Sequence, residues 1–225
     1  WSCAMKVKLP RTPFTVAVSG GIDSMVLANF VLKGKKNFDV LHFNHGTANA
    51  NRYEEFVGKW CENNGVSMIT FHYSPERDED PLGIENSEFA WSKWRNGIMQ
   101  GFPRLVLTAH HANDSLESFL MRGSRIEFIN GNVLRPLIGW KKSDVRDYAA
   151  RNCVEYMIDP TNSSDEFRRN RIRNSLIPLM IDCGVNPFNL MDMCCNKFEG
   201  SNVDRLLPLI LDSENVEVGQ SVSGV

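Results

Sequence analysis

A short apolar run that ends in two glycines and leads at once into a helix-forming stretch most restricts the fold of this chain. Residues 14–18 (FTVAV) form the β-rich run, and residues 19–24 (SGGIDS) follow it. Beyond the glycines, apolar residues recur at helical spacing as far as Leu32. A buried strand, a tight turn and a helix predict the first half of a β-α-β unit, in which the strands run parallel.

The same alternation continues along the chain. Further strands are predicted at 38–43, 66–73, 104–107, 133–137 and 156–158. Helices are predicted at 53–64, 85–100, 114–121, 144–152 and 172–180, with Ser143 as the N-cap of the helix 144–152. The pattern predicts an α/β fold, a doubly wound, mostly parallel, Rossmann-like sheet with helices on both faces and a short C-terminal helical extension.

Length and composition fit one such domain. The chain has 225 residues and a formal net charge of −2, ordinary for a globular protein. We expect an N-terminal extension at 1–13, a main domain at 14–186, and an extension at 187–225 that is helical within 189–211 and frayed from 212 onward. Trp1–Ala4 precede Met5, so either Met5 is the natural start or these four residues are native.

The length of the apolar runs and the spacing of the cysteines indicate in which cellular compartment the protein works. No apolar run reaches the roughly 18 residues that a membrane span needs, and no signal peptide is recognised at the start. The six cysteines include no CxxC pair, which favours ordinary thiols over a metal cluster. We expect a cytoplasmic protein without membrane contact.

The glycine loop has the composition of a phosphate-binding turn. Two glycines let the backbone fold tightly and turn N–H groups toward an anion, while Ser19 and Ser24 add hydroxyl donors. Asp23 can hold a magnesium ion that neutralises phosphate charge. No lysine follows, so this is not a Walker A loop. A plain strand-to-helix turn is the alternative.

A second cluster consists of His111, Asp114 and Glu117. Their spacing of i, i+3 and i+6 puts all three roughly on one face of a helix that follows a predicted strand. An acidic pair beside a histidine can grip a cationic amine and accept its proton. A helix N-cap with two surface acids is the alternative.

Three further groups of residues are candidates. Arginine forks match phosphates. Arg122 and Arg125 follow the predicted helix 114–121, and one short segment holds Arg168, Arg169, Arg171 and Arg173, although a solvated basic face is the alternative. The second strand ends in His42, Asn44, His45 and Gly46, where backbone atoms can cradle adenine and ribose. On the helix 85–100, Phe89, Trp91 and Trp94 favour packing against the sheet over RNA stacking, and Lys141 and Lys142 favour solvated surface.

Several ordered motifs resemble one family. SGGxDS after a hydrophobic strand resembles the PP-loop of N-type ATP pyrophosphatases, which cleave ATP between the α and β phosphates and adenylate a substrate oxygen. Residues 14 to about 180 are similar to the tRNA(Ile)-lysidine synthetases. The matching stretches are HFNHG (42–46), TAHHANDSLESFLMRGS (108–124), LRPLIGWKKSDVRDYA (134–149), DPTNSS (159–164) and RRNRIRNSLIP (168–178).

The resemblance implies a ligase that uses ATP and Mg²⁺ to attach free L-lysine to C2 of the wobble cytidine of tRNA(Ile) with a CAU anticodon. ATP would bind to Ser19, Gly20, Gly21, Ile22, Asp23, Ser24, His45 and Gly46, with Asp23 also holding the metal ion. Asp114 and Glu117 would receive lysine, helped by His111, and these three with Asp23 would be catalytic. Arg122, Asn162, Arg169, Asn170 and Arg173 would contact tRNA or phosphate.

The chain also departs from the family pattern. Asn44 replaces a common aspartate, and the helix after the third strand offers Lys93 and Arg95 in place of an arginine pair. Relatives continue into further tRNA-holding domains, so tRNA affinity here would rest on the patches named above or on a homodimer. Two alternatives stay open: another adenylating PP-loop enzyme, such as a tRNA thiolase or an amidotransferase relative, and a non-catalytic nucleotide- or RNA-binding remnant.

Overall fold

The computed structural model describes residues 6–74, 88–158, 168–196 and 214–217. Within them, a six-stranded sheet has the order β4-β3-β2-β5-β7-β6. All neighbouring strands run parallel except β6, which is antiparallel to β7. The predicted fold class is confirmed. The strands are β2 (Phe14–Ala17), β3 (Phe38–Asn44), β4 (Met68–His72), β5 (Leu105–Leu107), β6 (Ile129–Asn130) and β7 (Val133–Leu134).

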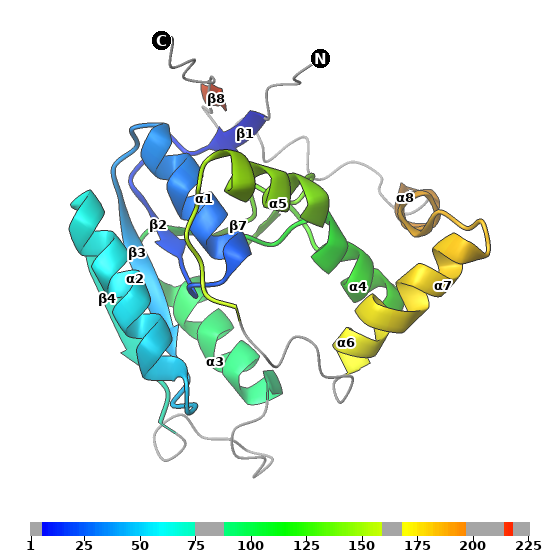
Figure 1. Cartoon of the computed structure of the whole chain (residues 1–225), viewed down its shortest axis with the longest axis horizontal. Helices are drawn as coiled ribbons and strands as arrows, with labels where there is room; N and C mark the ends of the chain where they lie inside the picture. Colours follow the sequence, from blue (N-terminus) through cyan, green and yellow to red (C-terminus); the bar gives the residue numbers. More distant parts are fainter. Residues whose placement is uncertain (1–5, 75–87, 159–167, 197–213, 218–225) are drawn as a thin grey trace.

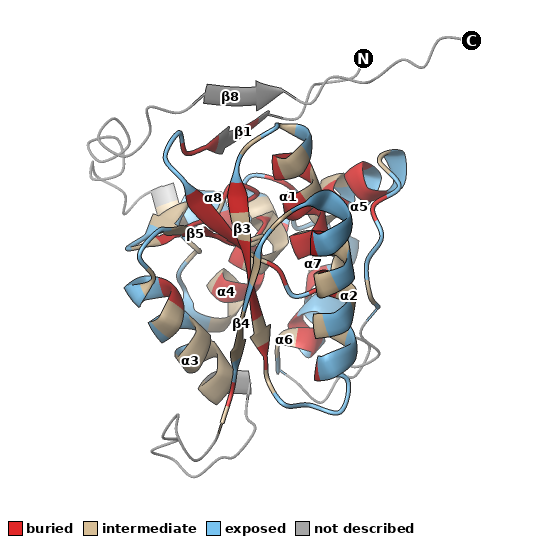
Figure 2. Ribbon diagram, turned by 90° about the vertical axis from the view of Figure 1, so that its left-hand side faces the viewer, coloured by how far each residue is buried: buried red, intermediate tan, exposed pale blue. Residues whose placement is uncertain are grey.

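Helices cover both faces of this sheet (Figures 1 and 2). One face carries α1 (Ile22–Lys33), α2 (Ala50–Asn64) and α5 (Lys142–Arg151), and the other carries α3 (Glu88–Gly101) and α4 (Ala112–Arg122). The chain runs outward from β2 to β3 and β4, then returns to β5 on the other side of β2. Ligands bind where the strand order reverses in this way, at the carboxyl ends of the strands. The loops after β2 and β5 both open there.

The main core lies between the sheet and the helices α1, α2 and α5. Phe30 of α1 is fully buried and meets the rings of Trp140 and Tyr148 at centroid distances of 5.9 and 5.8 Å. Such aromatic pairs add about 0.5–1.5 kcal/mol each beyond the burial of their surface. The helix that begins at the glycine loop is therefore firmly anchored along its length.

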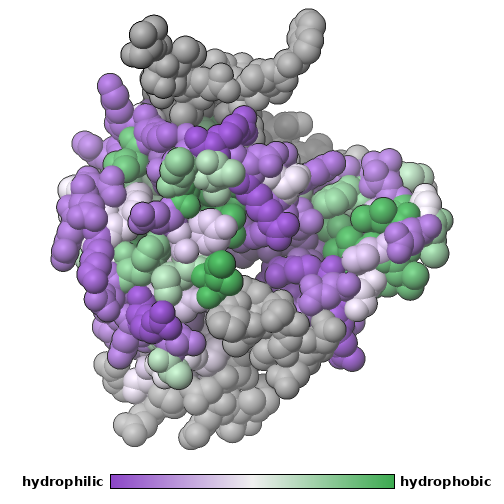
Figure 3. Space-filling model, in the orientation of Figure 1, coloured by the Kyte–Doolittle hydropathy of each residue, from purple (hydrophilic) through white to green (hydrophobic). Residues whose placement is uncertain are grey.

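A helical arm follows the sheet domain (Figure 1). It consists of α6 (Arg168–Arg171), the π-helical turn η2 (Ile172–Leu176), α7 (Ile177–Asp182) and α8 (Pro187–Asn196). Ile172, Ile177 and Met191 of the arm bury their side chains against Leu116 of α4. This packing fixes the arginines of α6 and η2 next to α4. Figure 3 shows apolar surface on the arm. The exposed large apolar residues of the arm include Leu179, Ile181 and Met193.

Two local predictions are wrong. The helix predicted at 144–152 begins at Lys142 with Lys141 as its N-cap, because the carboxylate of Asp144 accepts the Lys141 N–H at 2.7 Å. Ser143 therefore lies inside the first turn. Residues 156–158 are not a strand, because the N–H of Met157 donates to the carbonyl of Gly20 at 2.9 Å. That bond ties this segment to the glycine loop.

The two extensions also differ from expectation. β1 (Lys6–Leu9) pairs antiparallel with β8 (Glu214–Glu217) in a separate two-stranded sheet, so the tail expected to fray forms a strand over these four residues. Val7 and Leu9 of β1 are buried in the main core. Pairing with a strand some 200 residues away is invisible to a local reading of the sequence. No helix among the described residues is long and apolar enough to cross a membrane.

Candidate functional site

The turn after β2 and the first three residues of α1 are held together by their own hydrogen bonds. We call this segment, residues 18–24, the phosphate loop. The Ser24 hydroxyl donates to the carbonyl of Gly21 at 2.9 Å and accepts the N–H of Ser19 at 3.1 Å. Gly20 has φ +90°, and a Cβ added there would lie 3.0 Å from Cδ1 of Tyr53 on α2. Only glycine suits this position, because the backbone is left-handed and α2 packs closely against it.

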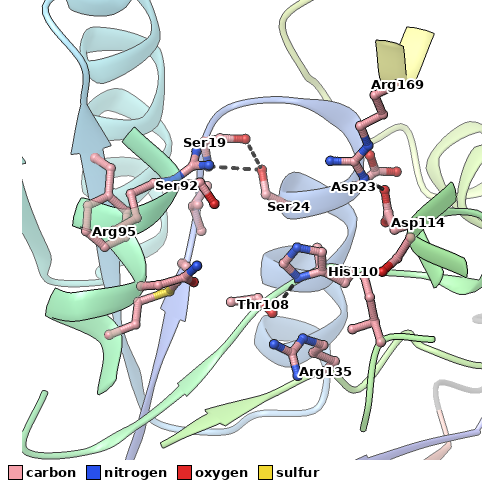
Figure 4. A pocket seen from close by; sticks show the side chains of 18 of the residues that line it. Ser19, Asp23, Ser24, Ser92, Arg95, Thr108, His110, Asp114, Arg135 and Arg169 are labelled. Carbon is pink, nitrogen blue, oxygen red and sulfur yellow. Dashed lines mark hydrogen bonds and ion pairs between the residues drawn. The ribbon is translucent and has the colours of Figure 1, made fainter. Parts of the chain in front are cut away.

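The phosphate loop presents the start of a helix to the crevice. Gly21 is the N-cap of α1, so the N–H groups of the first residues, Ile22 to Ser24, have no acceptor within the helix. These donors and the positive end of the helix dipole favour an anion. Figure 4 shows Ser19, Asp23 and Ser24 together on this side of the cavity. The composition predicted a phosphate-binding turn, and this helix start offers the backbone donors that such a turn needs.

Asp23 already has a cationic partner in the chain. The Lys142 ammonium lies 2.5 and 2.7 Å from the two carboxylate oxygens of Asp23. Burial acts to raise the pKa of Asp23, but a hydrogen bond from His111 and the charge of Lys142 outweigh it and lower that pKa to about 2. Asp23 is therefore ionised at neutral pH. The expectation that Lys142 is solvated surface is wrong.

The surroundings of Asp23 fit a magnesium ion that takes one ligand from the protein and the others from phosphate oxygens and water. The Asp23 side chain is 33% exposed and lines the cavity beside the phosphate loop. Mg²⁺ usually takes one or two carboxylates, phosphate oxygens and water, so a single protein ligand suffices. In the described part of the chain, no cluster of three histidine, cysteine or acidic side chains could hold a metal ion.

His111 caps α4 and lies between two carboxylates. Its Nδ1 is 3.2 Å from Oδ2 of Asp114, and its Nε2 is 3.4 Å from Oδ1 of Asp23. The N–H of His111 donates in turn to Asp114 at 2.9 Å, which completes a capping box. Only 3% of the His111 side chain is exposed. His111 thus links the phosphate loop to α4 from behind the cavity wall.

Asp114 and Glu117 differ in their access to the cavity. Asp114 lines it, and its Oδ1 accepts a hydrogen bond from Nη2 of Arg169 at 2.7 Å. Glu117 is 1% exposed and accepts from Nε of Arg169 at 2.5 Å and from Nε and Nη2 of Arg173 at 2.7 and 3.0 Å. The helical arm therefore holds both acids through two arginines, one on α6 and one on η2. We call these four side chains the Asp114–Arg173 cluster.

The crevice at the switch point is a cavity of about 640 Å³. Figure 3 shows a hollow in the middle of the face, with hydrophilic residues above it and to its right and apolar residues to its left. Eight of the residues predicted for the site are outside the lining: Gly20, Gly21, Ile22, Gly46, His111, Glu117, Asn170 and Arg173. Asn162, with Asp159, falls outside the described residues. Those that do line it are Ser19, Asp23, Ser24, His45, Asp114, Arg122 and Arg169.

A family model described as the PP-loop domain matches residues 4–180. The chain belongs to the PP-loop family. The tRNA(Ile)-lysidine synthase of Lactiplantibacillus plantarum is 31% identical over 204 residues, 82% of this chain and 45% of that protein. That of Exiguobacterium sibiricum is 29% identical over 191 residues, 79% of this chain and 45% of that protein. These relatives confirm the resemblance read from the motifs, and the chain spans about half the length of the curated relatives it matches.

A solved structure supports the PP-loop fold. The U34-tRNA thiolase NcsA from Methanococcus maripaludis superposes with a TM-score of 0.67 over 87% of this chain and 75% of that chain. The two are 14% identical in sequence, so this likeness concerns the fold alone.

One wall of the PP-loop cavity is aromatic. His45 stacks on Trp91 of α3 at 5.2 Å and meets Trp94 edge-on at 5.7 Å. Trp94 also packs against Phe43 of β3, which is the packing on the sheet that was predicted for it. The side chain of Phe89 falls outside the described residues. Burial, and then the charge of Arg95, lower the pKa of His45 to about 4, which keeps the ring neutral at neutral pH. This wall suits a flat, uncharged group such as a base.

Three residues that line the cavity, and Lys142 outside its lining, were missed as candidates in the sequence. Lys142 reaches Asp23, as described above. His110 lines the cavity and its Nδ1 lies 2.9 Å from Oγ1 of Thr108. Arg95 lies 3.2 Å from Nε2 of His45, and Arg135 follows β7 directly. The signal for His110 was available, because it lies just after the predicted strand 104–107. Arg135 falls inside the predicted strand 133–137, and only the observed end of β7 at Leu134 places it at the carboxyl edge of the sheet.

Proposed function

We propose that this PP-loop domain adenylates C2–O of the wobble cytidine of tRNA(Ile) with a CAU anticodon and joins lysine to that carbon. One observation carries the proposal. A phosphate loop and an acidic cluster open into the same cavity, and His111 bridges Asp23 of the first to Asp114 of the second. Ligation through an adenylate needs an anion subsite and an amine subsite at this kind of separation.

In the adenylation step, the cytidine oxygen attacks the α phosphorus of ATP and pyrophosphate leaves. The N–H groups at the start of α1 and the hydroxyls of Ser19 and Ser24 would bind the departing phosphates. Lys142, which lies against Asp23, supplies a cation that can turn to them. A magnesium ion on Asp23 would neutralise further phosphate charge. The aromatic wall at His45 is available for the adenine.

In the second step, the ε-amine of lysine attacks C2, the C2–O bond breaks and AMP leaves. The amine is mostly protonated at neutral pH and must lose its proton first. Asp114 faces the cavity and His111 Nδ1 lies 3.2 Å behind it, so the pair can hold the ammonium and take the proton. An arriving ammonium competes with Nη2 of Arg169 for Asp114, and this end of the guanidinium can then turn toward the anionic adenylate.

Arginines along the cavity rim would meet the tRNA. Arg122 and Arg168 line the cavity from α4 and α6, and both are exposed. Arginine forks match backbone phosphates and carry no sequence information by themselves. We therefore assign the anticodon loop to this rim and the choice of nucleotide to the cavity. A tRNA substrate also makes the cytoplasm the compartment of the reaction.

The test is a labelled-lysine assay. The protein is incubated with ATP, Mg²⁺, labelled L-lysine and a tRNA(Ile) transcript with a CAU anticodon. We expect label in the tRNA with a matching amount of AMP. AMP release that is indifferent to lysine would support another PP-loop chemistry instead, and absence of AMP would point to a non-catalytic nucleotide-binding protein.

A variant sharpens the assignment of the amine subsite. Asp114→Asn removes the charge that faces the cavity while keeping its shape, so we expect a larger rise in the apparent KM for lysine than in that for ATP. Asp147→Asn, at an exposed position of α5 that does not line the cavity, is the matched control. An unchanged lysine dependence removes Asp114 from the lysine site.

A further inference from the structure

The turn that ends β3 is held by one buried side chain. Asn44 is 2% exposed, and its Oδ1 accepts the N–H of Gly46 at 2.9 Å in an Asx turn. Gly46 has φ +72°, and His45, between the two residues, lines the cavity. Because the Gly46 N–H can only donate, the amide NH₂ of Asn44 points the other way. The turn that carries His45 into the cavity wall therefore depends on Asn44.

The amide NH₂ of Asn44 joins this turn to α2. It donates to Oε2 of Glu54 at 2.6 Å and to Oδ1 of Asn51 at 3.0 Å. The backbone carbonyl of Asn44 also accepts the N–H of Tyr73, just beyond β4, at 2.8 Å. Both the oxygen and the nitrogen of the Asn44 amide are therefore used within the protein, so any contribution of this side chain to a ligand is indirect.

The same stretch of α2 also touches the phosphate loop. A Cβ added to Gly20 would lie 3.0 Å from Cδ1 of Tyr53, which directly precedes Glu54 in the sequence. One turn of α2 therefore contacts the phosphate loop through Tyr53 and the turn after β3 through Glu54. A nucleotide whose phosphates lie at the loop and whose base lies at the aromatic wall of His45 spans these two places. Its affinity then depends on a spacing that preorganised contacts keep fixed.

We propose that Asn44 and Glu54 are positioning residues for the base of the nucleotide. Their hydrogen bond holds the aromatic wall at His45 at the distance from the phosphate loop that ATP spans. The assignment rests on the part of the proposed function that places adenine at this wall. It also accounts for the asparagine at a position where family members commonly have aspartate. A carboxylate there would face that of Glu54 where an amide nitrogen now donates at 2.6 Å, and like charges so close repel each other.

Calorimetric titration of the full chain with two ligands tests the pair. The first ligand is α,β-methylene-ATP, which cannot be cleaved between its α and β phosphates, and the second is inorganic tripolyphosphate, which has no base. With Mg²⁺ present, we expect Asn44→Asp to weaken binding of the ATP analogue roughly 10-fold and to change tripolyphosphate binding by less than about 2-fold. Asn37→Asp, exposed at the opposite end of β3, is the matched control and is expected to bind both ligands as the wild type does.

A compensating substitution shows whether the hydrogen bond itself matters. Adding Glu54→Gln to Asn44→Asp exchanges the acid and the amide, so we expect affinity for the ATP analogue to return to within roughly 3-fold of the wild type. Glu54→Ala removes the same bond from a side chain that is 29% exposed, and it is expected to cause the same selective loss even if Asn44→Asp does not fold.

Three results overturn the assignment: equal losses for the two ligands, unchanged binding of the ATP analogue in the single variants, and a double variant that binds no more tightly than Asn44→Asp. The titrations contain neither lysine nor tRNA. A failure of the labelled-lysine assay would therefore refute the proposed function and leave a selective loss of nucleotide binding as support for the positioning role.

Discussion

Removing the charge of Glu117 tests whether the Asp114–Arg173 cluster stabilises the fold as well as the site. Glu117 is 1% exposed and accepts three hydrogen bonds from guanidinium groups. In Glu117→Gln one oxygen becomes an amide NH₂, which faces guanidinium donors and cannot accept from them. Taking one partner from a buried ion pair costs about 3–5 kcal/mol.

The cost at this site is expected to lie below that range. The side chains of Arg169 and Arg173 are 34% and 40% exposed, so water can partly rehydrate them once the carboxylate is gone. We therefore expect Glu117→Gln to lower the free energy of unfolding by about 2–3 kcal/mol. For a chain of this length, the melting temperature would fall by roughly 4–12 °C.

Urea unfolding followed by circular dichroism measures the loss. Glu62→Gln on the exposed surface of α2 is the control and is expected to change stability by less than about 0.5 kcal/mol. A double-mutant cycle with Glu117→Gln and Arg173→Gln measures the interaction energy of this pair. We expect Arg173→Gln to lower the free energy of unfolding by less in the Glu117→Gln background than in the wild type. A loss no larger than that of the control would refute the view that Glu117 is held as a buried, paired anion.

Three further predictions concern the phosphate loop, Asp23 and the thiols. Gly20→Ala is expected to lower the free energy of unfolding by about 1–3 kcal/mol, because φ is +90° and the new Cβ meets Tyr53. Gly21→Ala, at φ −75°, is the control. Equal losses of stability for the two variants in urea unfolding would contradict the prediction. Asp23 has a folded pKa of about 2, below its ordinary value of 3.8, so its contribution to stability is complete above about pH 4 and is lost as the pH falls toward 2. Asp23→Asn is expected to remove the loss of stability between about pH 4 and pH 2, measured as the pH dependence of the urea midpoint. The same pH dependence in the variant as in the wild type would count against the ion pair of Asp23 with Lys142. Burial raises the pKa of Cys61 to about 11, so iodoacetamide at pH 8 is expected to label exposed thiols such as Cys153 and to spare Cys61 in peptide mapping by mass spectrometry.

The fold was largely predictable because each β-α unit carries its own local signals. The apolar run at 14–18, the glycines and the helical spacing beyond them needed no distant contact to be recognised. By contrast, β8 forms only by pairing with β1 at the other end of the chain. A segment with little apolar character gives no local sign of such a partner, so it was expected to fray.

The site was predictable in its residues more than in their arrangement. Spacing on α4 brought His111, Asp114 and Glu117 to one side of the helix, as expected. Which of them faces solvent depends on the arm, since Arg169 and Arg173 cover Glu117 from 52 and 56 residues farther along the chain. Lys142 was misjudged for the same reason: Asp23, its partner, lies 119 residues away.

Each carboxylate that faces the cavity already has a counterion from the chain, Lys142 on Asp23 and Arg169 on Asp114. Ligand binding is then an exchange of ions in which the number of ion pairs changes little. Affinity for ATP and for lysine would accordingly respond weakly to ionic strength. A tRNA bound as proposed above would add phosphate contacts to arginines at the rim, and its affinity would depend steeply on salt. One protein would thus treat its small and large ligands differently as the salt concentration of its surroundings changes.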